Sequence, residues 1–142
     1  MVQNDIPSCL VIIREGWDKF IAQTATPDLS DMFSSAAWRP HFYVAVDDND
    51  VVGLVGYNVA WLAHGVYSLT WLGVTKEKRG EGIGTMLVER CLADLRPIGN
   101  ALILVTDVPD YYRANWNFVS VTTLRTSENE EQTMMMLEFE DE

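Results

Sequence analysis

The sequence contains few cysteines and few basic residues, and each shortage excludes a class of protein. The two cysteines, Cys9 and Cys91, lie in largely apolar helical patterns, and neither has a histidine or a second cysteine at metal-ligand spacing. We therefore expect reduced core residues, no disulfide and no metal site. Ten basic residues stand against 21 acidic ones, a formal net charge of −11. Such a surface would repel nucleic acid and favours cationic partners such as amines, although it also serves solubility alone.

Long apolar runs and linkers are missing as well. No run of about 18 apolar residues occurs, the length that a membrane span needs. The N-terminus lacks a basic flank followed by an apolar core, so no secretory signal and no membrane association are expected, and the expected location is cytoplasmic. No shift in composition divides the chain, which predicts a single domain over residues 1–142.

Glycine, in contrast, is concentrated at one place. The segment from residue 74 to residue 84 follows an apolar strand pattern and opens an amphipathic helix, with glycines at positions 80, 82 and 84. Glycines let the backbone turn sharply and approach a ligand closely, and the first turn of a helix offers N–H groups without intrahelical partners. Together with the cation of Arg79, this arrangement predicts a site for a pyrophosphate.

Two other phosphate-binding loops fit the segment less well. A P-loop requires a lysine between its last glycine and a serine or threonine, whereas Thr85 follows Gly84 directly. A dinucleotide fingerprint requires Gly-x-Gly-x-x-Gly, and here Thr85 takes the last place. The remaining alternative is a turn that only connects a strand to a helix.

The rest of the chain alternates helix and strand patterns. Apolar residues at helical spacing predict helices over residues 6–23, capped by Asp5, and 29–37, and a helix from residue 83 to the Pro97–Gly99 break. Period-two and continuously apolar patterns predict strands over 42–46, 51–61, 66–74, 101–105, 118–125 and 133–140. Glycines at 53 and 56 are interpreted as bulges. The strands over 66–74 and 101–105, with the helix between them, are expected to form one βαβ unit.

The spacing Arg79-x-x-Gly82-x-Gly84 resembles the acyl-CoA signature of the GNAT family of N-acetyltransferases, and the order of elements is similar along nearly the whole chain. The resemblance implies an α/β fold with a mixed, mostly antiparallel sheet flanked by helices. It implies that the strand before the loop pairs with the pantetheine arm of acetyl-CoA through Leu72, Gly73 and Val74. It assigns the pyrophosphate to seven consecutive residues: Arg79, Gly80, Glu81, Gly82, Ile83, Gly84 and Thr85.

A second segment, from residue 111 to residue 118, resembles the family's aromatic-Tyr-x-x-x-Gly-Phe signature. It implies that the hydroxyl of Tyr112 protonates the thiolate that leaves when an amine attacks the acetyl group, and it adds Asn115 as a cofactor-binding candidate. The segment departs from the pattern, because Trp116 or Asn117 replaces the glycine and the spacing is one residue longer. Tyr111 therefore stays open as the acid, and aromatic packing is the alternative for both tyrosines.

The family often places a glutamate on the strand before the glycine loop, but residues 66–74 contain no carboxylate. His41 and His64 titrate in a useful range but lie in predicted loop positions, so we expect deprotonation of the amine through water. The predicted function is transfer of an acetyl group from acetyl-CoA to a primary amine by direct attack in a ternary complex. The alternative is an acyl-CoA-binding sensor without activity. The sequence leaves the acceptor and a homodimer open.

Overall fold

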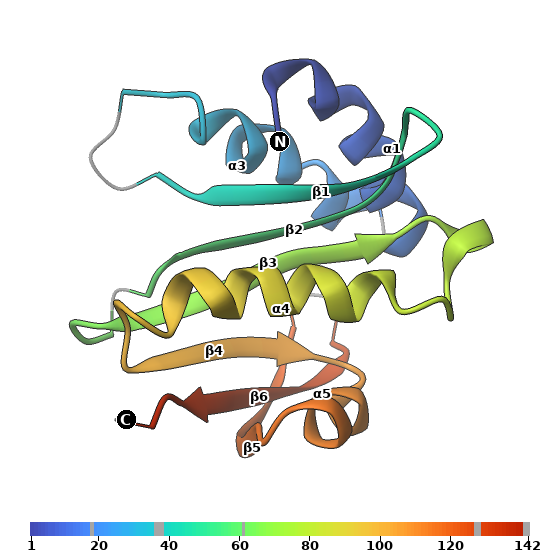
Figure 1. Cartoon of the computed structure of the whole chain (residues 1–142). Helices are drawn as coiled ribbons and strands as arrows, with labels where there is room; N and C mark the ends of the chain where they lie inside the picture. Colours follow the sequence, from blue (N-terminus) through green and yellow to red (C-terminus); the bar gives the residue numbers. More distant parts are fainter. Residues whose placement is uncertain (18, 36–38, 61, 127–128, 141–142) are drawn as a thin grey trace. The chain divides into compact units, whose positions relative to one another are not determined.

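The computed structural model describes residues 1–17, 19–35, 39–60, 62–126 and 129–140 (Figure 1). The helices are α1 (Ile6–Gly16), α2 (Lys19–Ala22), α3 (Ala25–Asp31), α4 (Ile83–Leu95) and α5 (Pro109–Asn115), with 3₁₀ turns η1 (Gln3–Asp5) and η2 (Lys76–Lys78). The strands are β1 (His41–Asp47), β2 (Asp50–Val59), β3 (Val66–Val74), β4 (Ala101–Thr106), β5 (Val119–Arg125) and β6 (Glu131–Glu138).

The strands form one sheet in the order β1-β2-β3-β4-β6-β5. The β3–β4 pair is parallel, whereas β1–β2, β4–β6 and β5–β6 are antiparallel. This confirms the predicted mixed, mostly antiparallel sheet and the parallel crossover through α4. The chain forms two compact units, one of residues Met1–Asn58 and Thr70–Asp94, the other of Val59–Leu69 and Leu95–Glu142.

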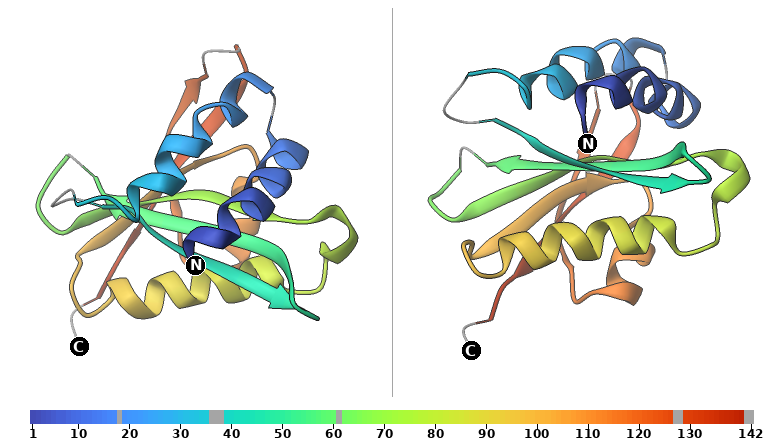
Figure 2. Two further views of the ribbon diagram at one scale, coloured as in Figure 1. Left: turned by 90° about the horizontal axis from the view of Figure 1, so that it is seen from above. Right: turned by 45° about the horizontal axis from the view of Figure 1, so that its top comes forward.

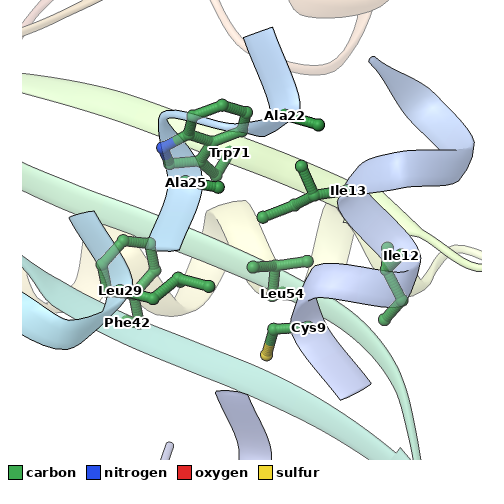
Figure 3. Packing of buried hydrophobic residues seen from close by; sticks show 9 residues of the cluster. All are labelled: Cys9, Ile12, Ile13, Ala22, Ala25, Leu29, Phe42, Leu54 and Trp71. Carbon is green, nitrogen blue, oxygen red and sulfur yellow. The ribbon is translucent and has the colours of Figure 1, made fainter. Parts of the chain in front are cut away.

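In the first unit, the strands lie between two layers of helix. Figure 2 shows α1 and α3 on one face of β1 and β2, with α4 on the opposite face. The face toward α1 and α3 carries a cluster of buried side chains (Figure 3), which consists of Cys9, Ile12, Ile13, Ala22, Ala25, Leu29, Phe42, Leu54 and Trp71. Apolar burial of this kind supplies the main stabilisation of the unit.

The predicted helix over residues 6–23 is wrong in its continuity. α1 ends at Gly16, Trp17 has an extended backbone (φ −127°, ψ 156°), and a separate α2 begins at Lys19. The interruption lets the Trp17 ring meet Trp71 edge-on, with ring centroids 5.1 Å apart and an interplanar angle of 68°. A tertiary contact therefore outweighs the local helical pattern.

The starts of the first helices also differ from prediction. Asp5 occupies the N-cap position of α1 but makes no capping bond, because its carboxylate accepts a 2.7 Å hydrogen bond from the Val2 N–H. The second predicted helix, 29–37, is wrong in its bounds, because α3 begins after Thr24 and has ended before residues 36–38, which lie outside the described residues.

The β1–β2 hairpin turns through Asp48 and Asn49, both with positive φ (49° and 70°). Of the two predicted bulges, one is confirmed, since the ladder shifts register beside Gly53. The other is wrong, because Gly56 pairs in regular register with Phe42. A Cβ at Gly56 would lie 2.4 Å from the Phe42 ring, so this glycine makes room for a buried aromatic side chain.

α4 follows its predicted pattern. Its buried residues are Leu87, Val88, Cys91, Leu92 and Leu95, and Met86 on the other side is 70% exposed. Both cysteines are buried free thiols, as predicted. Within the described part of the chain, no helix is long and apolar enough to cross a membrane.

The second unit contains the β4–β6–β5 part of the sheet and α5. Its strand bounds differ slightly from prediction, since β5 begins one residue after 118 and β6 runs two residues ahead of the predicted 133–140. Directly before β6, the Thr126 N–H donates a 2.9 Å hydrogen bond to the Glu130 carbonyl. Residue 61, the predicted end of the second strand, lies outside the described residues.

Candidate functional site

The edge of β3 that faces β4 is paired over only part of its length. The parallel ladder contains three residue pairs, from Val66 with Ala101 to Ser68 with Ile103. The described ladder ends at Ser68, ahead of the predicted pantetheine-binding residues 72–74. Peptide groups on such a strand edge can pair with an extended ligand.

The glycine loop follows η2 directly and contains two left-handed residues. Gly80 and Gly82 have φ values of 82° and 85°, which side-chain-bearing residues seldom adopt. A Cβ built on either glycine would meet no atom within 4 Å. The backbone here therefore borders open space, and residues 79–82 are exposed.

α4 begins at the end of this loop. The first backbone hydrogen bond of the helix runs from the Met86 N–H to the Gly82 carbonyl over 3.1 Å. The amides of Ile83 and Gly84 precede that bond, so they have no acceptor within the helix, and the helix dipole adds partial positive charge at this end. The local geometry suits an anionic ligand.

Arg79 is joined to the strand that enters the loop. Its Nε donates a 3.0 Å hydrogen bond to the Val74 carbonyl, and the side chain is exposed. Its neighbour Lys78 instead forms a 2.9 Å ion pair with Asp47. No ion pair found among the described residues involves Arg79, so its charge is available to a phosphate.

The end of α1 contacts β3 and η2 just ahead of the glycine loop, which sequence reasoning missed. The Glu15 carboxylate accepts a 3.3 Å hydrogen bond from the Lys76 N–H, and a Cβ on Gly73 would lie 3.2 Å from the Trp17 ring. Gly73 thus allows close packing of α1 on β3. The sequence holds no local signal for these contacts, because about 60 residues separate the partners.

The predicted acid, Tyr112, lies in the second unit on α5. It is 6% exposed, and its ring packs against Tyr111, Trp116 and Phe118 with centroids 5.0, 6.0 and 5.6 Å away. Burial raises the pKa of Tyr112 above its ordinary value of 10, and the neighbouring Tyr111 and Asp107 raise it further. The phenol is therefore protonated throughout the neutral range.

The other candidates have simpler surroundings. Asn115 is exposed at the end of α5, and its side-chain amide donates a 2.8 Å hydrogen bond to the Tyr111 carbonyl. His64 is exposed in a turn, as predicted.

His41 differs from prediction, since it begins β1 and its ring packs edge-on against the ring of Tyr43, with 4.8 Å between the ring centroids. Its pKa is lowered by desolvation, against the opposing effect of Asp94.

Comparison with known proteins gives the family of this α/β fold. Residues 10–119 match the acetyltransferase (GNAT) family, and the chain belongs to that family. A search of curated proteins found no match.

Solved structures show the same fold at low sequence identity. A protein from Desulfovibrio desulfuricans assigned to the GNAT family superimposes with a TM-score of 0.86 at 19% identity, covering 98% of this chain and 95% of its own. An aminoglycoside 6'-N-acetyltransferase complexed with coenzyme A gives 0.77 at 15% identity, covering 96% and 91%. The ribosomal-protein-S18-alanine N-acetyltransferase of Escherichia coli gives 0.76 at 14% identity, covering 100% and 92%.

Proposed function

We propose that this chain transfers an acetyl group from acetyl-CoA to a primary amine, by direct attack in a ternary complex. The observation that carries the proposal is the open backbone at Gly80 and Gly82, which have left-handed conformations and no atom within 4 Å of a built Cβ. That geometry, at the start of α4 and beside Arg79, fits the pyrophosphate of coenzyme A. Acetyl-CoA supplies an activated thioester carbonyl.

The chain's own groups would bind and orient the reactants. The amides and side chains of residues 79–85 hold the pyrophosphate, and the edge of β3 at Leu72, Gly73 and Val74 pairs with the pantetheine arm, with Asn115 a further contact. The Leu72 N–H polarises the carbonyl that the amine attacks. Holding amine and thioester together supplies most of the rate increase.

Proton transfer completes the reaction. The neutral amine nitrogen forms the new C–N bond as the C–S bond breaks, and the Tyr112 phenol donates its proton to the departing sulfur. The excess proton on nitrogen passes to water, which returns a proton to the Tyr112 oxygen. The Tyr112 phenol carries its proton at neutral pH, as a donor must, although its raised pKa makes it a weaker acid. The net charge of −11 supports a cationic acceptor. We place the reaction in the cytoplasm and involve no metal, nucleic acid or membrane.

A second candidate is an acyl-CoA-binding sensor. It is favoured by the dense aromatic packing of Tyr112 and by the absence of a carboxylate from β3. Acetyl-CoA consumption with a panel of polyamines, aminoglycosides, amino acids and peptide N-termini separates the two functions. Turnover with any amine supports the transferase. Binding of coenzyme A without turnover across the panel identifies a sensor.

A further inference from the structure

Trp71 has a backbone conformation that its residue type disfavours. Its φ is +52°, in the left-handed region that bulky residues seldom adopt. Among the described strand residues, no other has a positive φ. Strained backbone of this kind persists only where the surroundings impose it, and it is concentrated at functional sites.

The surroundings hold the Trp71 ring at two points. The ring belongs to the cluster drawn in Figure 3 and is 8% exposed. It packs edge-on against Trp17, a partly buried residue beside that cluster. Its Nε1–H donates a 2.8 Å hydrogen bond to the carboxylate of Asp28 on α3. Asp28 itself is exposed, so a surface carboxylate provides the polar anchor of a buried ring.

The residue that follows Trp71 is Leu72. A change of φ at one strand residue rotates the peptide groups on its two sides relative to each other, so the direction of the Leu72 N–H depends on the Trp71 backbone. We propose that Asp28 is a positioning residue, which holds Trp71 in its left-handed conformation and thereby aims the Leu72 amide. The inference rests on the proposed function, in which that amide polarises the thioester carbonyl.

Substitutions at both partners test the hydrogen bond. Asp28→Ala removes the acceptor, whereas Asp28→Asn keeps a side-chain oxygen in place and removes only the charge. A misplaced catalytic group commonly costs tenfold to a hundredfold, so kcat of Asp28→Ala should fall by about tenfold or more. Asp28→Asn should stay within about threefold, and the dissociation constant of coenzyme A should be unchanged in both, because the phosphate loop is untouched.

A double-mutant cycle adds specificity. Trp71→Phe keeps an aromatic ring but removes the donor, so it should lose as much activity as Asp28→Ala, and the combined variant should lose no more than either. Asp31→Ala, one turn further along α3, is the matched control and should behave like the parent.

A readout independent of activity is the indole N–H signal of Trp71 in a ¹H–¹⁵N spectrum without coenzyme A, assigned by its loss in Trp71→Phe. The chemical shift of this signal should change in Asp28→Ala and stay close to the parent value in Asp28→Asn and Asp31→Ala. An unmoved signal or parental kcat in Asp28→Ala would overturn the inference. So would an equal loss in Asp28→Asn, which would mean that the charge acts directly on the amine. A parent protein without turnover would overturn the proposed function instead, and the indole signal would still decide whether Asp28 holds Trp71.

Discussion

The Nε of Arg79 lies 3.0 Å from the carbonyl oxygen of Val74, so the guanidinium at the start of the phosphate loop is tied to the last residue of β3. One side chain thus links the two segments assigned to coenzyme A, the strand edge and the glycine loop. The bond uses only one of the five N–H donors of the guanidinium, which leaves its outer edge to contact a phosphate.

Removal of this side chain should weaken coenzyme A binding. A hydrogen bond to a charged group contributes about 1.5–3 kcal/mol, so Arg79→Ala should raise the dissociation constant by about tenfold to a hundredfold. The dissociation constant of Arg79→Lys should lie between those of the parent and Arg79→Ala, because lysine keeps the charge and loses the hydrogen bond to Val74. Calorimetric titration at two salt concentrations measures both effects.

Lys78→Ala is the control for this series. The Lys78 ammonium already pairs with Asp47, so its removal should change the affinity for coenzyme A by less than about threefold. Equal losses in Lys78→Ala and Arg79→Ala would show that the loop attracts the ligand by general charge alone.

The Tyr112 hydroxyl is the second target. Tyr112→Phe preserves the ring packing and removes the proton, so kcat should fall by about a hundredfold or more while the affinity for coenzyme A is unchanged. Tyr111→Phe, on the adjacent residue, is the control. Steady-state kinetics with a reactive amine checks both. A large loss only in Tyr111→Phe would transfer the acid role to that residue, and slight, equal losses would leave packing as their only role.

The pH dependence of stability should report on His41. Desolvation lowers the pKa of His41 below the ordinary value of 6.5, so the unfolded chain binds a proton more readily than the folded one. The contribution of His41 to the unfolding free energy is therefore complete above about pH 6.5 and decreases as the pH falls below it. Urea unfolding at pH 7.5 and pH 5.5 should show a smaller decrease for His41→Asn than for the parent. An equal decrease in the unfolding free energy of the parent and His41→Asn would mean that groups other than His41 cause it.

The packing of Phe42 gives a test of the fold itself. A Cβ at Gly56 would lie 2.4–2.9 Å from three atoms of the Phe42 ring, which is fully buried and cannot withdraw. Overpacking of a core costs about 1–3 kcal/mol, so Gly56→Ala should lower the free energy of unfolding by that amount. Gly16→Ala is the control, since its Cβ would have no neighbour closer than 4.0 Å and alanine favours helix. Denaturant titration gives the free energy of unfolding of both variants. Equal values for Gly56→Ala and Gly16→Ala would contradict the described packing of Gly56 against Phe42.

The sequence predicted the elements whose patterns are local. The period of α4, the bounds of β3 and the apolar run of β4 all follow from residues adjacent in the chain, and the structure confirms them. The break after Gly16 was missed, because it depends on the contact of Trp17 with Trp71, far along the chain. The role of Gly56 was missed for the same reason, since only the paired strand reveals the Phe42 ring.

The candidate site likewise has a part that the sequence predicted and a part that it did not. Glycine spacing alone predicted the loop, and the left-handed Gly80 and Gly82 give a physical reason for those glycines. Nothing local marks the hydrogen bond between Asp28 and Trp71, because tryptophan in a strand pattern predicts an ordinary extended conformation. The division of roles between Tyr111 and Tyr112 stays a prediction.

The central claim, that residues 79–85 bind the pyrophosphate of coenzyme A, is tested most directly by the melting temperature with and without coenzyme A. At about a hundred times the dissociation constant, binding stabilises the fold by about 2.7 kcal/mol, so the parent should melt several degrees higher. Gly82→Val places a branched side chain in the open space beside the loop and should abolish that shift.

Gly65→Val is the matched control, since Gly65 also has a left-handed φ (80°) but lies in the turn before β3. It should lower the melting temperature without ligand and keep the shift with coenzyme A. Our account predicts a shift of several degrees in the parent and in Gly65→Val, and none in Gly82→Val. No shift in the parent at millimolar coenzyme A, or an equal shift in Gly82→Val, would contradict it.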